Sequence, residues 1–185
     1  MTQTTTTIPG YLTGRWTIDP VHSEIGFAVR HMMVSKVRGR FTSFEGEIVT
    51  GEDPLDSSVQ ASIALSSVDT GNEDRDGHLR SADFFGTDAN DTMTYRSTSV
   101  RRDGHDLIVD GELTLKGVTK SVPLHLEIGG FGPDAFGGTR AGFTATGSIS
   151  RSEFGVEFNG VMETGGVIVG DTVELRLEVE GVLAS

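Results

Sequence analysis

Apolar and polar residues alternate with a period of two through most of this chain. Such a period places successive side chains on opposite faces of a β strand. The clearest case runs over residues 173–180, where Val or Leu alternates with Glu or Arg. The same alternation predicts further strands around 16–18 and over 24–30, 38–49, 59–65, 92–100, 107–115, 122–128 and 143–149. We therefore predict eight or nine strands, each with one wet and one dry face.

These strands follow one another with turn sequences between them and few helical patterns. Asp103-Gly104 and Lys116-Gly117 are typical of tight turns, because glycine adopts positive φ without strain. The 25 glycines are too many for a helical bundle and fit the turns and bulges of a sheet. Consecutive strands without crossover helices pair antiparallel. The length of the strands then favours an all-β antiparallel barrel over a sandwich.

One segment departs from the period of two. Thr70 and Glu73 have the spacing of a capping box, which predicts a short helix over about 71–82. Leu79 gives this helix a narrow apolar stripe, and Phe84 and Phe85 follow it. We expect the helix to cover one end of the barrel.

The rest of the chain shows no linker or internal repeat. We expect a flexible N-terminal segment, 1–12, and a single barrel domain, 13–185. The opening residues lack the basic and apolar regions of a secretory signal, so we expect a cytoplasmic protein. No apolar run approaches the roughly 18 residues that span a bilayer, so we expect no stable membrane anchor.

Charge and cysteine content restrict the chemistry of possible partners. The chain has 27 Asp and Glu against 15 Lys and Arg, a formal net charge of -12. This excess opposes attraction to phosphate backbones, so we predict no nucleic-acid partner. Cysteine is absent, which excludes disulfides and thiolate sites.

Histidine is the residue type that most invites a catalytic or metal site here. His22 and His31 are nine residues apart, so on a regular strand they face opposite sides and cannot share one ion. Asp74 and His78 share a helix face, but no third ligand is evident. The chain also lacks a Gly-x-Ser-x-Gly elbow and a dinucleotide fingerprint. We predict no catalytic residue, no metal, no cofactor and no enzymatic activity.

The parity of the predicted strands indicates which side chains face the interior. His31 is in phase with Phe27 and Val29, so we expect it to point inward, whereas His22 is out of phase and should brace the strand start. Several expected inward positions are small, namely Ala61, Gly111, Ala145 and Gly147. An eight-stranded barrel either fills its interior or holds one ligand, and small residues favour a cavity, although a packed interior is the alternative.

Four stretches of the sequence stand out in order. They are WTIDPVHSEIGFAVRH (16–31), RDGHLRSADFF (75–85), LTLKGVTKSV (113–122) and RSEFGV (151–156), the last followed by 167–175. Together they resemble one family, the YceI-like, polyisoprenoid-binding proteins. The resemblance covers about residues 14–182. Where the family usually has an acidic residue and then a proline after Phe84-Phe85, this chain has Gly86 and Asp91.

The resemblance implies a lipocalin-like eight-stranded antiparallel barrel, commonly in a homodimer, that encloses an isoprenoid chain. The implied function is binding, storage or transport of a polyisoprenoid such as a prenyl quinone or a polyprenyl phosphate, with the bound lipid in place of a cofactor. We expect the ligand to contact Phe27, Val29, His31, Arg38, His78, Leu79, Phe84, Phe85, Phe143 and Phe154. Two alternatives stay open: a lipid-modifying enzyme using His31, and a protein-interaction barrel with an exposed strand edge.

Overall fold

The protein is described here by a computed structural model covering residues 8–160 and 168–184. In this part of the chain, one α-helix, α1 (Glu73–Arg80), and three short 3-10 helices, η1 (Pro54–Asp56), η2 (Leu65–Ser67) and η3 (Arg151–Phe154), accompany the strands. The strands are β1 (Gly14–Ile18), β2 (Glu24–His31), β3 (Ser35–Phe41), β4 (Phe44–Thr50), β5 (Ser58–Ala64), β6 (Val68–Asp69), β7 (Thr92–Asp103), β8 (Asp106–Leu115), β9 (Val118–Ser121), β10 (Leu124–Pro133), β11 (Thr139–Ser150) and β12 (Val169–Leu183).

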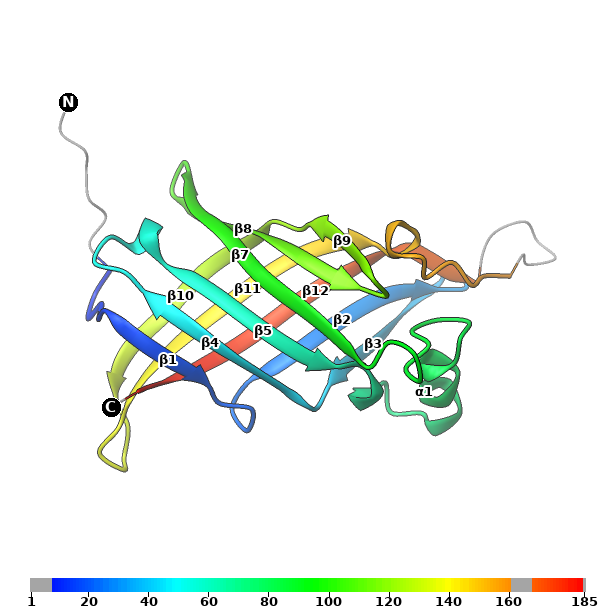
Figure 1. The fold of residues 1–185 in the computed structure, drawn as a ribbon, viewed down its shortest axis with the longest axis horizontal. Helices are drawn as coiled ribbons and strands as arrows, with labels where there is room; N and C mark the ends of the chain where they lie inside the picture. The colour runs from blue at the N-terminus through cyan, green and yellow to red at the C-terminus, as the bar shows by residue number, and fades with distance from the viewer. Residues whose placement is uncertain (1–7, 161–167, 185) are drawn as a thin grey trace.

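The strands form a closed antiparallel barrel of eight (Figure 1). Four of the eight are broken into two pieces each, namely β1 with β2, β3 with β4, β5 with β6, and β9 with β10. The barrel closes where β1 pairs with β12, with Trp16 opposite Leu183. The predicted fold class, including the short helix, is therefore confirmed. Because β1 and β12 are paired, the closing strands do not present the free edge that the interaction-barrel alternative needed.

Alternation along each strand places the apolar side chains inside. On β12, Val173, Leu175 and Leu177 face the interior, while Glu174 and Arg176 between them face outward. Antiparallel register keeps this order across the sheet, because Leu175 is opposite Phe27 of β2 and Leu177 is opposite Ala145 of β11.

Aromatic side chains pack across the end of the barrel where β1 begins. Trp16 is fully buried, and its Nε1 donates to Oγ1 of Thr50 at 2.9 Å. The Thr50 hydroxyl in turn donates to the carbonyl of Leu12 at 2.7 Å. The ring of Phe131 contacts Trp16 and Tyr11 edge-on, with centroids 5.5 and 5.3 Å away. Of the expected N-terminal segment, residues 1–7 lie outside the described residues, and Tyr11 belongs to this cluster.

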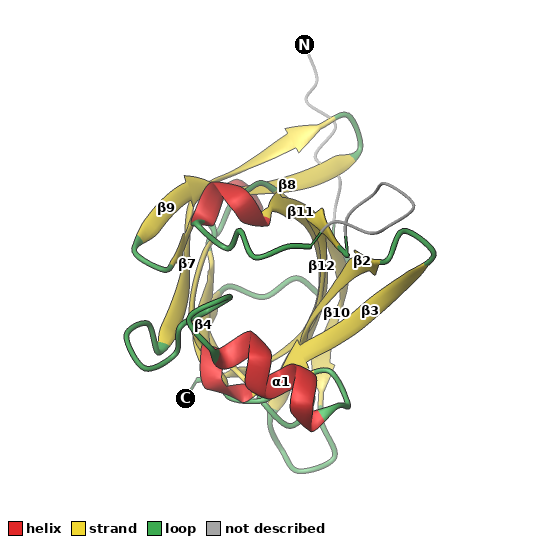
Figure 2. Ribbon diagram, turned by 90° about the vertical axis from the view of Figure 1, so that its right-hand side faces the viewer, coloured by secondary structure: helices red, strands yellow, loops and turns green. Residues whose placement is uncertain are grey.

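Helix α1 lies at the other end of the barrel (Figures 1 and 2). It spans Glu73–Arg80, and its N-cap is Asn72, whose Oδ1 accepts from the amide of Arg75 at 3.0 Å. The predicted capping box of Thr70 and Glu73 is therefore wrong. The amide and hydroxyl of Thr70 instead donate to the buried carboxylate of Asp76, at 2.9 and 2.5 Å, and this holds the helix against the end of β6.

Within residues 8–160 and 168–184, no helix combines the length and apolar character needed to cross a bilayer.

Candidate functional site

The interior of the barrel holds an apolar cavity of about 270 Å³. It runs from Tyr11 and Thr50 near the Trp16 cluster to Leu79, Phe84 and Phe85 below helix α1. Between these ends, the inward rows of the barrel strands make the wall, and these rows consist almost entirely of Val, Leu, Ile and Phe. The shape suits an elongated apolar molecule, because apolar area removed from water gains on the order of 25 cal/mol per Å².

Most of the few polar side chains in the wall already bond to the protein. The hydroxyl of Tyr95 donates to the carbonyl of Val122 at 2.8 Å, and burial raises the pKa of Tyr95 to about 12. The negative charge of Asp110 is the second, smaller cause of this raised pKa, because it disfavours the phenolate. The hydroxyl of Thr50 likewise donates to the carbonyl of Leu12. A ligand in the cavity therefore meets an apolar surface.

Arg151 is the charged residue in the cavity wall. It is buried, and its guanidinium donates to four carbonyls, those of Val156 and Gly170 at 2.8 Å, Phe158 at 2.9 Å and Val169 at 3.2 Å. Burial lowers its pKa because the charged form loses hydration, which nearby Asp171 partly offsets. Arg151 thus joins η3, the segment after it and the start of β12 at the α1 end.

Small inward residues contribute to the cavity at two of the four expected positions. Ala61 and Ala145 line it. At Gly111 the space is taken by the ring of Tyr95, since a Cβ there would lie 2.4 Å from that ring. At Gly147 the side chain of Leu124 lies 2.9 Å from such a Cβ. The two glycines allow close packing rather than opening volume.

Six of the ten residues expected at the ligand site line the cavity. They are Phe27, Val29, Leu79, Phe84, Phe85 and Phe143. The three strand residues line the cavity because their parity turns them inward. The three residues at the end of the helix line it because the α1 segment docks over the barrel. Whether a ligand touches them stays a prediction.

His31 and Arg38 do not line the cavity. His31 is opposite Val169, which does line it, but His31 is the last residue of β2 and stands at the rim. Arg38 is exposed on the outer face of β3, in register with Ala28. Its parity is opposite to that of Val37 and Phe41, so the structure places Arg38 outside the cavity, and its expected contact with the ligand stays a prediction.

His78 and Phe154 also lie outside the cavity lining. His78 is half exposed on α1, where Nε2 bonds to Asp83 at 2.9 Å. Its ring packs edge-on against Phe84 and Phe158, with centroids 4.9 and 4.8 Å away. Phe154 in η3 is buried in the apolar cluster that includes Phe84. Both residues support the wall from behind.

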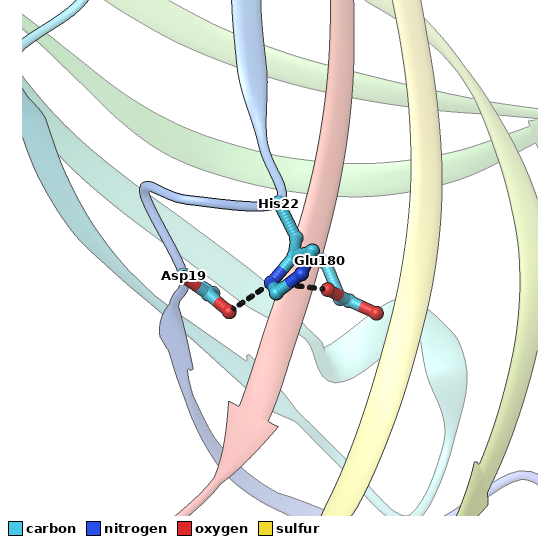
Figure 3. Close-up of side chains that lie close together, drawn as sticks. All are labelled: Asp19, His22 and Glu180. Atoms are coloured by element: carbon cyan, nitrogen blue, oxygen red, sulfur yellow. Dashed lines mark hydrogen bonds and ion pairs between the residues drawn. The ribbon is translucent and has the colours of Figure 1, made fainter. Parts of the chain in front are cut away.

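Asp19, His22 and Glu180 form the group with metal-ligand geometry among the described residues (Figure 3). Nδ1 of His22 lies 2.8 Å from Asp19 and 3.5 Å from Glu180. The guanidinium of Arg140 also contacts both carboxylates, at 2.6 and 3.3 Å. Hydrogen bonds from His22 and then Arg140 hold the pKa of Asp19 far below its usual range. With Arg140 in place, the group is an ion-pair network at the break between β1 and β2, where we expected His22 to brace the chain.

Tyr11, Tyr95 and Arg151 are among the wall residues that sequence reasoning missed. Tyr95 had a detectable signal, because Gly111 stands inside a strand, and an interior glycine indicates close approach by a neighbour. Arg151 lies in one of the stretches that resemble the family, but a lone arginine gives no indication that it is buried. Tyr11 lies outside any periodic segment.

Comparison with known proteins agrees with this architecture. The model of the YceI-like domain family matches residues 16–181. A UPF0312 protein of Staphylococcus epidermidis is 40% identical over 168 residues, which cover 90% of this chain and 96% of that protein.

Solved structures share the fold. BcnA of Burkholderia cenocepacia superposes with a TM-score of 0.77 at 22% identity, covering 88% of this chain and 98% of that one. A polyisoprenoid binding domain from Saccharophagus degradans gives a TM-score of 0.67 at 18% identity, covering 94% and 100%. The match of the family model over nearly the whole barrel, together with the identity to the staphylococcal relative, shows that the chain belongs to the YceI-like domain family.

Proposed function

We propose that this protein binds and carries a long-chain isoprenoid lipid, of the prenyl quinone or polyprenyl phosphate class, with its tail inside the barrel. The observation that carries the proposal is the elongated apolar cavity, whose wall runs from Tyr11 to Phe84 and Phe85. A polyprenyl tail needs apolar area and length rather than directed hydrogen bonds, and this wall offers both.

The relatives support the choice of ligand class. The Saccharophagus degradans domain, which shares the fold, carries polyisoprenoid binding in its name. Two of the four family stretches of this sequence also contribute to the barrel end, since Leu79, Phe84 and Phe85 come from one of them and Arg151 and Val156 from another. The segments by which the family is recognised therefore include part of the cavity wall.

The geometry favours binding over chemistry on the lipid. General acid or base catalysis requires a side chain within hydrogen-bond reach of the reacting atom. His31, the base of the enzymatic alternative, stands at the rim and does not line the cavity. The polar groups Tyr95 and Arg151, which do line it, are engaged by backbone carbonyls. A carrier needs no such convergent groups.

Mass spectrometry of organic extracts from the purified protein tests the proposal. We expect an isoprenoid lipid in the extract, and we expect added prenyl quinone or prenyl phosphate to raise the melting temperature of the emptied protein. A protein that is repeatedly empty and that neither lipid stabilises against heat would contradict the proposal. Homodimerisation and a cytoplasmic location also stay predictions, which sedimentation velocity and cell fractionation would check.

A further inference from the structure

The hairpin between β2 and β3 has an apolar tip. Met32, Met33 and Val34 are 43, 60 and 85% exposed. Three consecutive exposed apolar residues are unusual on a protein whose strands otherwise alternate apolar inward residues with polar outward residues. The tip adjoins the cavity end, because His31 beside it is opposite Val169, a residue of the cavity wall. Figure 2 shows the hairpin and α1 on the same rim of the barrel.

The turn itself is strained by these residues. Met32 and Met33 have φ values of 50° and 63°, and the amide of Val34 bonds to the carbonyl of His31. Met32 and Met33 are thus the central residues of a β-turn over residues 31–34, within a loop that joins the paired residues His31 and Ser35. A β-turn with positive φ at both central positions favours Asn and Gly, since other residues are disfavoured there. Methionine at both positions therefore does not serve the turn. Strain retained at an exposed position points to a role for the side chains.

The two strands of the hairpin, β2 and β3, carry several cationic side chains. Between Glu24 and Glu45 the sequence has no acidic residue, although it holds Arg30, Lys36, Arg38 and Arg40, four of the chain's 15 Lys and Arg. Arg30 and Lys36 are directly opposite each other in register, an arrangement of like charges that does not stabilise a sheet. Lys36 pairs with Glu174, and Arg40 lies 3.7 Å from Asp69. Within the described residues, Arg30 and Arg38 have no carboxylate partner.

We propose that the β2–β3 hairpin docks the barrel reversibly on an anionic lipid bilayer. The tip residues 32–34 enter the headgroup region, and Arg30 and Arg38 contact anionic headgroups. Exposed apolar residues flanked by cations are the pattern by which proteins bind a membrane surface without spanning it. The chain's net charge of -12 does not prevent this, because screening confines each charge to about 10 Å at 0.1 M salt. The inference goes beyond lipid carriage, since docking needs no bound ligand.

Cosedimentation with vesicles tests the proposal. Vesicles of phosphatidylglycerol and phosphatidylcholine should bind the full chain, and vesicles of phosphatidylcholine alone should bind it far less. Because each cation near an anionic surface contributes roughly fivefold to partitioning, Arg30→Gln with Arg38→Gln should weaken binding by about 25-fold. Met33→Ser with Val34→Ser should also weaken it. These side chains are exposed, so the variants should keep the melting temperature of the parent.

Matched controls lie elsewhere on the molecule. Phe136→Ser removes a side chain that is 91% exposed on the hairpin between β10 and β11, and Arg102→Gln removes an exposed cation on β7. Both should bind vesicles like the parent protein.

Three results would overturn the proposal. One is equal binding to both kinds of vesicle. A second is that the protein is retained on heparin while Met33→Ser with Val34→Ser leaves vesicle binding unchanged. This would make the hairpin a site for acidic polymers. A third is a change of oligomeric state by that pair without loss of vesicle binding, since this would make the tip a contact between copies of the chain.

Discussion

At the scale of single residues, the contact between Gly111 and Tyr95 shapes the cavity wall. A Cβ at position 111 would lie 2.4 Å from the ring and 2.9 Å from the carbonyl oxygen of Arg96. Gly111→Ala should therefore destabilise the protein by about 1–3 kcal/mol, the usual range for overpacking. Gly142→Ala, another strand glycine with no atom within 4 Å of its Cβ position, is the control. Urea denaturation that gives both variants the same stability would refute the packing argument.

Titration of Tyr95 provides a second test of the wall. Burial favours the neutral phenol and raises the pKa of Tyr95 to about 12, against about 10 for an unfolded chain. Its contribution to stability is complete below about pH 10 and is lost as pH rises through about 12. The chain has two tyrosines, so Tyr11→Phe leaves Tyr95 as the single phenol for ultraviolet titration. A midpoint near 10 would show that Tyr95 is exposed.

Parity along a strand could predict single wall residues, but it could not predict where a strand ends relative to the cavity. Phe27, Val29 and Phe143 follow the period of two and do line the cavity. His31 follows the same period but lies at the rim, because β2 ends there. Gly111 shows the other limit, since a small residue opens volume only if no neighbour fills it.

At the scale of elements, the ion-pair network at the β1–β2 break joins distant parts of the chain. Arg140 of β11 contacts Asp19 at 2.6 Å, Asp134 of the β10–β11 turn at 3.0 Å and Glu180 of β12 at 3.3 Å. Backbone amides of Gly138 and Phe136, and then Arg140, lower the pKa of Asp134. The network thus joins β11, the β10–β11 turn and β12 to the break between β1 and β2, where the pairing with β12 is interrupted.

The network predicts a loss of stability in acid. The pKa values of Asp19 and Asp134 are lowered, so their contribution is complete above their ordinary value near 4 and is lost as pH falls through the lowered values. Arg140→Met should lower the melting temperature at neutral pH. Below about pH 4, the melting temperature of this variant should decrease less steeply with falling pH than that of the parent. Arg102→Met, an exposed arginine on β7, should leave the pH profile of the parent. Parallel melting curves for Arg140→Met and the parent in acid would contradict this role.

Helix α1 shows what local sequence could and could not predict about an element. A helix in this region and its position at a barrel end were predictable from the break in the period of two. Its cap was not, because Thr70 bonds to Asp76 one turn into the helix and Asn72 becomes the N-cap. Two residues with similar capping ability compete here, and the packing of Asp76 against β6 decides between them.

At the scale of the whole molecule, closure of the barrel creates the enclosed volume. Ala145 lines that volume opposite Leu177, whereas Ala28 is on the outer face in register with Arg38 and Glu174. Ala145→Phe should fill part of the cavity and reduce the bound isoprenoid in organic extracts. Ala28→Phe adds the same ring outside and should leave the lipid content unchanged. A similar lipid content in both variants would place the ligand elsewhere.

The central claim is that the tail, and not the head group, occupies the barrel. The most direct measurement is the melting temperature of the emptied protein with prenyl alcohols of increasing chain length at one fixed concentration. Each added isoprene unit buries more apolar area, so affinity and the thermal shift should rise with chain length until the cavity is full. Ala145→Phe should reach its plateau at a shorter chain. A thermal shift that is the same for every chain length would contradict the account.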